Sequence, residues 1–162
     1  MKSFRYILGF ICVLFLIGCN QQSTSTTEQQ AVTFTVLAQG TQSGFNTDMP
    51  TAYKLDNEKD WQTFWDQHNS MMEPKPALPA VDFSQNMVVA IIDANQPSGG
   101  YQITVDKITA YSHRLHITAT RESPGANCMT MGAITQPFIF VTVPQSQDVP
   151  ELHLNSKIND CN

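Results

Sequence analysis

Hydrophobic residues alternate with polar ones along several stretches of the chain. Residues 101–108 and 114–121 alternate, with Tyr101, Ile103 and Val105 on one face of the first segment and Leu115, Ile117 and Ala119 on one face of the second, which predicts two strands with one buried face each. Residues 86–92 (NMVVAII) are apolar at almost every position. A run of this kind and length predicts a central strand that is buried on both faces.

The first strand is expected within residues 32–38 (VTFTVLA), where Val32, Phe34 and Val36 would share one face. A turn-rich stretch follows it, and residues 52–55 are a candidate for a short second strand. The pattern thus places two strands before any other element.

The C-terminal third of the chain is also rich in strand-forming residues. Residues 131–143 predict a long strand, within which Pro137 indicates a sheet edge or a bulge, since proline cannot donate a ladder hydrogen bond. Leu152 and Leu154 predict a last, short strand.

One segment has the period of a helix. Residues 56–60 combine a capping residue with acidic residues of a first turn, and three prolines within residues 71–79 end the pattern. Between them, the apolar stripe has helical spacing and contains Trp61, Phe64, Trp65 and His68. The sequence therefore predicts an α+β domain, a mainly antiparallel β-sheet or β-sandwich with one N-terminal helix.

The N-terminus has the features of an export signal. Lys2 and Arg5 precede an apolar run over residues 6–17, which is too short to span a bilayer as a helix. The run ends in LIGC, the pattern of a bacterial lipobox, so we expect cleavage before Cys19 and lipidation of its thiol. An ordinary signal peptide or an uncleaved anchor is the alternative.

Acyl chains on Cys19 would hold the domain on a membrane. Asn20 follows the cysteine where an Asp would favour inner-membrane retention, so we expect the outer membrane, with the domain facing the periplasm. The expected organisation is a signal peptide over 1–18, a lipidated cysteine and polar, flexible tether over 19–31, and one folded domain over 32–162.

Charge excludes one class of partner. Removal of residues 1–18 takes two of nine basic residues and none of fourteen acidic ones, which leaves a net charge of −7. An acidic domain without a basic run is not expected to bind nucleic acid.

Two of the four cysteines remain for the folded part once Cys12 is cleaved off and Cys19 is lipidated. Cys128 and Cys161 are expected to form a disulfide in an oxidising compartment. A free, buried Cys128 with a frayed Cys161 is the other possibility.

Candidate metal ligands are few. His113 and His116 lie in an alternating segment, where residues three apart point to opposite faces, so a joint site is not expected. Met129 and Met131 beside Cys128 are soft ligands that suit Cu(I), although both can simply pack. Nucleophile motifs and phosphate loops are absent from the sequence, so neither an enzyme nor a cofactor or metal is expected.

The loop over residues 95–101 (NQPSGGY) is the candidate interaction site. Its chemistry is that of a strand entry, in which the glycines take positive φ. On a β scaffold it can also act as a rigid recognition loop. Its candidate residues are Asn95, Pro97, Ser98, Gly99, Gly100 and Tyr101.

Several of these segments together resemble the C-terminal domain of PrcB, a lipoprotein subunit of a bacterial surface protease complex. The resembling segments are QGTQSGF, the helix with Trp61 and Trp65, VDFSQNMVVAI (81–91), PSGGY (97–101) and TQPFIFVTVP (135–144). They span nearly all of residues 32–144. The resemblance implies a non-catalytic accessory protein that binds a protein partner and helps a protease complex to assemble or stay stable.

Two alternatives remain open. The NQPSGGY loop loosely resembles the NPTTGY-type loop of chagasin-like protease inhibitors, from which it departs at the two threonines. A small-ligand or copper-binding protein of the periplasm is the other alternative.

Overall fold

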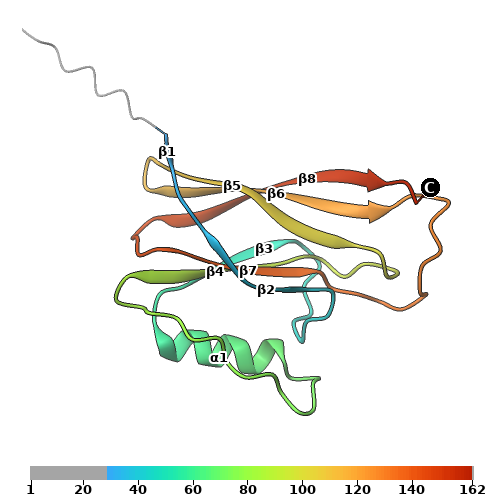
Figure 1. Cartoon of the computed structure of the whole chain (residues 1–162), viewed down its shortest axis with the longest axis horizontal. Coiled ribbons are helices and arrows are strands. Elements are labelled where there is room, and N and C mark those ends of the chain that lie inside the picture. The colour runs from blue at the N-terminus through green and yellow to red at the C-terminus, as the bar shows by residue number, and fades with distance from the viewer. Residues whose placement is uncertain (1–28, 162) are drawn as a thin grey trace, which may run out of the picture.

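The computed structural model describes residues 29–161, which form two four-stranded sheets and one helix (Figure 1). In chain order the elements are β1 (Gln30–Ala31), β2 (Thr35–Gly40), β3 (Thr51–Leu55), α1 (Glu58–His68), β4 (Asn86–Ile92), β5 (Gln102–Tyr111), β6 (Arg114–Pro124), β7 (Phe138–Pro144) and β8 (Val149–Asn159). The strands are ordered β1-β5-β6-β8 in one sheet, here the outer sheet, and β2-β7-β4-β3 in the other, here the central sheet.

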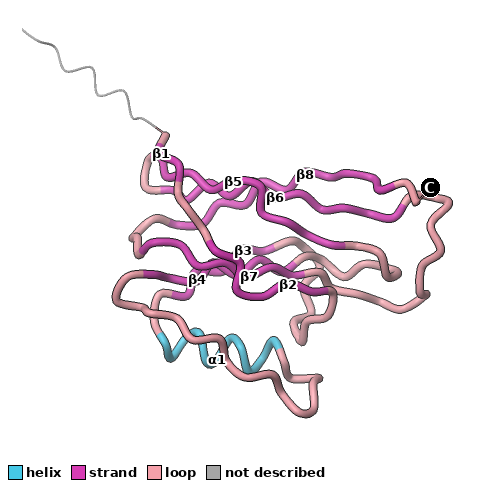
Figure 2. Tube along the Cα trace, in the orientation of Figure 1, coloured by secondary structure: helices cyan, strands magenta, loops and turns pink. Residues whose placement is uncertain are grey.

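The outer sheet, the central sheet and α1 form three layers (Figures 1 and 2). Neighbouring strands are antiparallel in every pairing of these sheets except that of β6 with β8. One hydrophobic core fills the space between the sheets, and a second lies between the central sheet and α1.

Strand β4 contributes side chains to both hydrophobic cores, as its unbroken apolar sequence predicts. Met87, Val89 and Ile91 belong to the core between the sheets. The residues between them, Val88 and Ala90, belong to the core beneath α1. Because successive side chains of a strand point to opposite faces, a strand that is covered on both faces must be apolar throughout.

Helix α1 begins and ends where the sequence indicates. Asn57 is its N-cap, and its side-chain oxygen accepts a hydrogen bond of 3.0 Å from the Asp60 amide. Trp61, Phe64, Trp65 and His68 are buried. The segment after the helix returns over it, so that Trp61 and Trp65 each donate an indole hydrogen bond of 3.0 Å, to the carbonyls of Pro79 and Pro76.

The β-rich α+β class is confirmed, but two finer expectations are wrong. The helix is not N-terminal, because three strands precede it. Val36 does not share a buried face with Val32 and Phe34: its side chain is 48% exposed, whereas the other two pack on the core between the sheets. The chain leaves the outer sheet after β1 and enters the central sheet at β2, so Val32 and Phe34 lie in the connection between the two sheets and only Val36 lies in a strand.

The C-terminal strands also differ from expectation. Residues 131–137 form a loop, and β7 begins after Pro137 and runs inside the central sheet, between β2 and β4. Pro137 therefore marks the start of a central strand rather than an edge or a bulge. Strand β8 is long rather than short, with 11 residues paired in parallel to β6.

The strand directions place the connections at two opposite ends of the sandwich (Figures 1 and 2). The loop end carries the β2–β3, β4–β5 and β6–β7 connections and the end of β8. The entry end carries β1, the β5–β6 turn and the β7–β8 connection. Residues 1–28, which contain the expected signal peptide, Cys19 and most of the expected tether, lie outside the described residues.

Candidate interaction site at the loop end

The NQPSGGY segment connects β4 of the central sheet to β5 of the outer sheet, and neighbouring loops hold it on both sides. Gln96 pairs with Thr135 through backbone hydrogen bonds of 2.7 and 3.0 Å, and the Gly99 amide donates to the Met131 carbonyl at 2.9 Å. On the other side, the Asn95 side chain donates to the side-chain oxygen of Asn46 at 2.9 Å. The loop is thus fixed to the β2–β3 and β6–β7 connections.

The candidate residues of this loop differ in their exposure to solvent, and so in how well they could contact a partner. Asn95, Pro97 and Gly100 are exposed, whereas Ser98, Gly99 and Tyr101 are partly buried. The Ser98 carbonyl accepts a hydrogen bond of 2.8 Å from the Thr135 hydroxyl. Tyr101 precedes the first residue of β5 rather than starting the strand. The exposed part of the loop is therefore its Pro97 turn and the backbone of Gly100.

Only one of the two glycines has the positive φ that the sequence suggests for both. Gly100 has φ of +89°, and a Cβ atom there would lie 3.2 Å from both Pro124 Cβ and Thr130 Cγ2. Gly99 does not lie in the positive-φ region, and its nearest neighbours would be at 3.7 Å or more. Gly100 therefore lets the loop pass close to the β6–β7 connection.

A buried ion pair lies beneath the loop. Asp93 follows β4 and is fully buried, and both of its carboxylate oxygens accept hydrogen bonds from the guanidinium of Arg121 on β6. The Ala94 amide also donates to Asp93 at 2.8 Å, and the Gln96 side chain donates at 3.3 Å. The pair thus joins the central sheet to the outer sheet and orients the first residues of the loop.

The hydrogen bonds to Asp93 raise the pKa of Arg121 above its ordinary value. A two-pronged contact of this kind also fixes the orientation of the guanidinium plane. Sequence reasoning missed this pair. The sequence does contain one indication of the pair: Asp93 comes directly after a strand that is predicted to be buried on both faces. A carboxylate at such a position needs a charged or hydrogen-bonding partner.

Exposed methionines and an isoleucine lie at the same end of the sandwich as the loop. Met131 is 76% exposed, Met129 is fully exposed, and Ile134 is 70% exposed. Met49 and Met71, from the β2–β3 connection and the segment after α1, are 73% and 72% exposed. A shallow groove between Met71 and Ile134 also has Asn95 in its wall. Flexible, polarisable methionine side chains of this kind suit contact with varied protein surfaces.

The Cys128–Cys161 disulfide that the sequence predicts is present at the same end, with Cα atoms 5.1 Å apart. It joins the β6–β7 connection to the residues that follow β8. The Gly125 amide donates to the Asn159 carbonyl at 2.9 Å and adds a second link between the same segments. The β6–β7 connection, which carries Met129 and Met131, is thus fastened at its base.

A buried serine–histidine pair lies under the β2–β3 connection. Ser43 Oγ is 3.0 Å from His68 Nδ1, and the Gly44 amide donates to the His68 carbonyl at 2.7 Å. Burial lowers the pKa of His68 to about 4, so the imidazole is neutral at physiological pH. Ser43 and His68 are 4% and 2% exposed, and the pair fastens the β2–β3 connection to the end of α1 beside a hollow that Gln42, Met71 and Met72 also line.

Residues 29–161 contain no group of three His, Cys, Asp or Glu side chains that could hold a metal ion. His113 lies in the β5–β6 turn with φ of 61°, and His116 lies on β6. These histidines are at the entry end, away from Met129 and Met131. The same part of the chain has no helix long and apolar enough to cross a bilayer.

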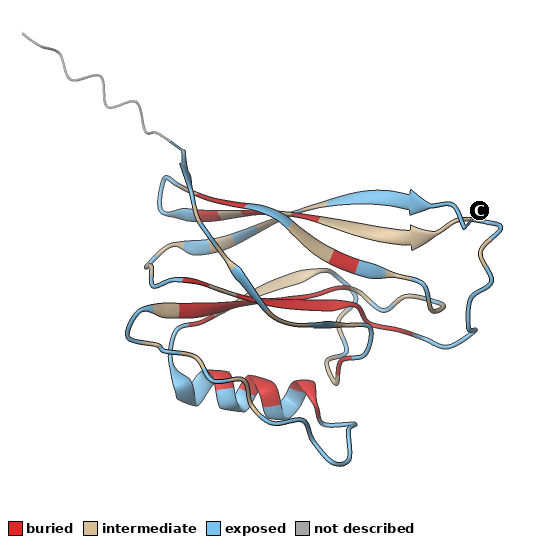
Figure 3. Ribbon diagram, viewed as in Figure 1, coloured by how far each residue is buried: buried red, intermediate tan, exposed pale blue. Residues whose placement is uncertain are grey.

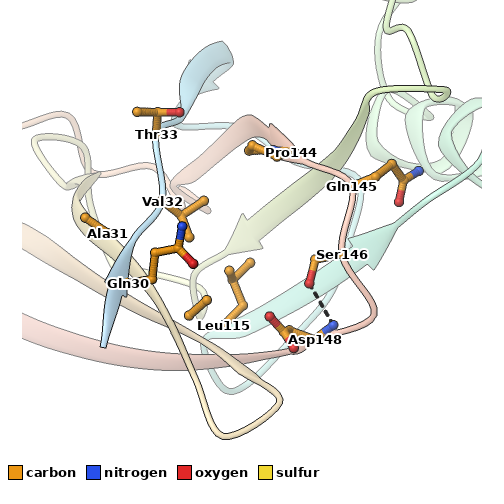
Figure 4. Close-up of a pocket in the computed structure, with 10 residues that line it drawn as sticks. Gln30, Ala31, Val32, Thr33, Leu115, Pro144, Gln145, Ser146 and Asp148 are labelled. Atoms are coloured by element: carbon orange, nitrogen blue, oxygen red, sulfur yellow. Dashed lines mark hydrogen bonds between the residues drawn. The ribbon is translucent and has the colours of Figure 1, made fainter. Parts of the chain in front are cut away.

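A second hollow opens at the entry end, between β1, the first part of β6 and the β7–β8 connection (Figure 4). It measures about 350 Å³ and is lined by Gln30–Thr33, Leu115 and Pro144–Ser146, among others. Asp148 is the one ionisable side chain among the lining residues, and its own amide is hydrogen bonded to Ser146 Oγ at 3.0 Å. These walls offer no pair of titratable groups for catalysis.

The family comparison covers part of the chain that builds the loop end. Residues 87–144 match the PrcB C-terminal family. The matched segment runs from β4 to β7 and includes Asp93, Arg121 and the whole NQPSGGY loop. This confirms the resemblance over these residues, while the resembling segments before Met87 lie outside the match. The chain matches none of the curated proteins and none of the solved structures.

Proposed function

We propose that this chain is a non-catalytic accessory lipoprotein that binds a protein partner through its loop end. The observation that carries the proposal is the gathering of the anchored NQPSGGY loop and exposed apolar side chains at one end of the sandwich. Three connections build this surface, and the Asp93–Arg121 pair and the disulfide hold them. A rigid loop surface with exposed methionines is suited to protein recognition.

The match to the PrcB C-terminal family supports a protease complex as the setting in which the partner is found. In this proposal the chain contributes binding and stabilisation and does not itself cleave a substrate. The net charge of −7 expected for residues 19–162 makes a partner with a neutral or basic face more favourable than an acidic one.

Membrane attachment is the second part of the proposal. A lipid on Cys19 holds the domain at the outer membrane, facing the periplasm, and raises its effective concentration for partners on the same membrane. The described chain begins at the entry end, opposite the loop end, so attachment at the N-terminus leaves the loop surface free. Metabolic labelling with a palmitate analogue should mark the original chain and leave Cys19→Ala unlabelled.

Site-specific photocrosslinking in intact cells tests the binding surface. A photoreactive residue at Met131 or Pro97 should capture a defined protein, which mass spectrometry identifies. The same residue at Ser112, an exposed position in the β5–β6 turn at the entry end, is the matched control. Capture of the same protein at all three positions, or of none at Met131 and Pro97, would contradict the proposed surface.

The position of the loop on a β-sandwich also supports inhibition of a papain-like protease as a second candidate function. The purified protein should then slow papain at micromolar concentration, and Gly100→Ala should weaken the effect. Unchanged papain activity would exclude this candidate and leave the accessory role untouched.

A further inference from the structure

Strand β8 has a neighbour on one side only. It is the last strand of the outer sheet in the order β1-β5-β6-β8, and its 11 residues pair with β6 alone. Much of the strand is exposed, increasingly so toward its C-terminal end (Figure 3). An exposed strand edge of this length presents a row of backbone groups to which another strand can hydrogen bond.

The register shows which backbone groups of β8 are free. The Val149 amide donates to the His113 carbonyl at 3.2 Å, and the Asn159 carbonyl accepts from the Gly125 amide at 2.9 Å. In a parallel ladder every second residue directs both its N–H and its C=O to the same neighbour. The odd-numbered residues of β8 therefore pair with β6, and the even-numbered ones, from Pro150 to Ile158, direct their backbone groups away from the sheet.

Pro150 is consistent with this assignment, because a proline in a sheet is tolerated where its nitrogen faces away from the ladder. The free N–H groups are those of Leu152, Leu154, Ser156 and Ile158. Leu152 and Leu154 direct their side chains to the core between the sheets, whereas Ile158 is 67% exposed.

We infer that the occupant of this edge is a second copy of the chain, paired β8 to β8 in antiparallel orientation with Leu154 opposite Leu154 of the second copy. The charges of β8 select this partner and register. Glu151 then lies opposite Lys157 of the second copy, and His153 lies opposite Asn155. The two-fold symmetry forms each of these contacts twice.

The neighbouring strand extends the charge complementarity. Within one copy, Glu151 lies 3.5 Å from Arg114, and Lys157 lies 2.8 Å from Glu122. Across the paired edges, four charged side chains form a row in which positive and negative charges alternate. In order they are Arg114 and Glu151 of one copy, then Lys157 and Glu122 of the other. Moving the two-fold axis by one residue toward the N-terminus, from Leu154 to His153, places Lys157 opposite Val149. Moving it to Asn155 places Lys157 opposite His153, so both alternative registers lose the favourable pairs.

The same register covers an exposed apolar side chain. Ile158 of one copy lies opposite Pro150 of the other, on the face that continues the core. The Ile158 amide can donate to the Pro150 carbonyl, although the proline cannot return the hydrogen bond. Leu154 and Leu152 occupy the centre of the joined edge, and the two outer sheets form one continuous sheet.

Charge exchange tests the pairing with full-length chains that carry two different tags and are expressed together. Glu151→Lys alone places like charges opposite each other twice, and so does Lys157→Glu alone. We expect each variant to lose co-purification with itself by roughly tenfold, because like charges directly opposite destabilise a strand pair. A mixture of the two variants restores both opposite-charge pairs and should recover co-purification. Glu73→Lys and Lys75→Glu, exposed positions in the segment after α1, are the controls.

Cysteine crosslinking tests the register. His153→Cys with Asn155→Cys in one chain should give a disulfide-linked dimer in membranes, since opposed residues of a non-hydrogen-bonded pair have Cα atoms about 4.5 Å apart. Val149→Cys with Glu151→Cys should give none, because every combination of these two positions lies six or more residues apart in this register. The inference is overturned if two differently tagged copies of the original chain do not co-purify. It is also overturned if the single charge variants co-purify as well as the original chain, or if their mixture co-purifies no better than either variant alone.

Discussion

Asp93 and Arg121 form a two-pronged ion pair that joins the two sheets directly beneath the NQPSGGY loop. Asp93 is fully buried at the end of β4, while the Arg121 side chain is 22% exposed on β6. The two residues are 28 positions apart in sequence, and both lie in the segment that matches the PrcB C-terminal family. The pair therefore couples the stability of the sandwich to the geometry of the candidate site.

Loss of the arginine should be costly. Arg121→Ala leaves the Asp93 carboxylate buried without its charged partner, which should lower the free energy of unfolding by about 2–4 kcal/mol. Urea unfolding of the purified protein measures this change. Lys157→Ala removes the partner of Glu122 from a pair whose lysine side chain is 63% exposed, so it should cost much less than Arg121→Ala. Equal losses for the two variants would contradict the role of the buried pair.

The two adjacent glycines of the loop should respond differently to alanine. Gly100→Ala imposes a Cβ on a residue with φ of +89° and brings it within 3.2 Å of Pro124 and Thr130, so a loss of about 1–2 kcal/mol is expected. Gly99→Ala has room for its Cβ and should change stability by less than about 0.5 kcal/mol. Thermal unfolding of both variants under one condition compares them, and a Gly99→Ala variant that is the less stable of the two would refute the assignment.

The disulfide should stabilise the fold by closing a loop. Cys128 and Cys161 are separated by 33 positions, so the chain-entropy model gives about 3–4 kcal/mol for the crosslink. Replacement of both cysteines by serine should lower the melting temperature, and a reducing agent should then have no further effect. If the original protein unfolds at the same temperature with and without the reducing agent, the crosslink contributes nothing to stability.

Local patterns specified several elements well. The apolar run over residues 86–92 fixed both the bounds and the two-sided burial of β4, because each of its side chains must face one core or the other. The stripe of Trp61, Phe64, Trp65 and His68, with Asn57 before it, located α1 for the same reason. These features depend on residues close in sequence and on burial, which periodicity records directly.

Long-range features were not visible in the same patterns. The parallel pairing of β6 with β8 depends on β7 leaving for the other sheet between them, and no local period encodes that. The bond between Asp93 and Arg121 likewise requires two strands of different sheets to end side by side. The loop was found as a candidate from its Pro and Gly content, but the residues that hold it come from two other segments, the β2–β3 and β6–β7 connections.

Buried His68 should make stability depend on pH. Its pKa is about 4 in the folded protein, against an ordinary value of 6.5 that it regains on unfolding. As the pH falls from 6.5 to about 4, the unfolded chain takes up a proton that the folded protein does not, so stability is greatest above this window and declines within it. The full loss should be about 3 kcal/mol. Urea unfolding at about pH 7.5 and about pH 5 should show this slope in the original chain and in His153→Gln, which alters an exposed histidine. His68→Gln, which keeps a hydrogen-bonding partner for Ser43, should flatten it. An unchanged slope in His68→Gln would assign the pH dependence to other groups.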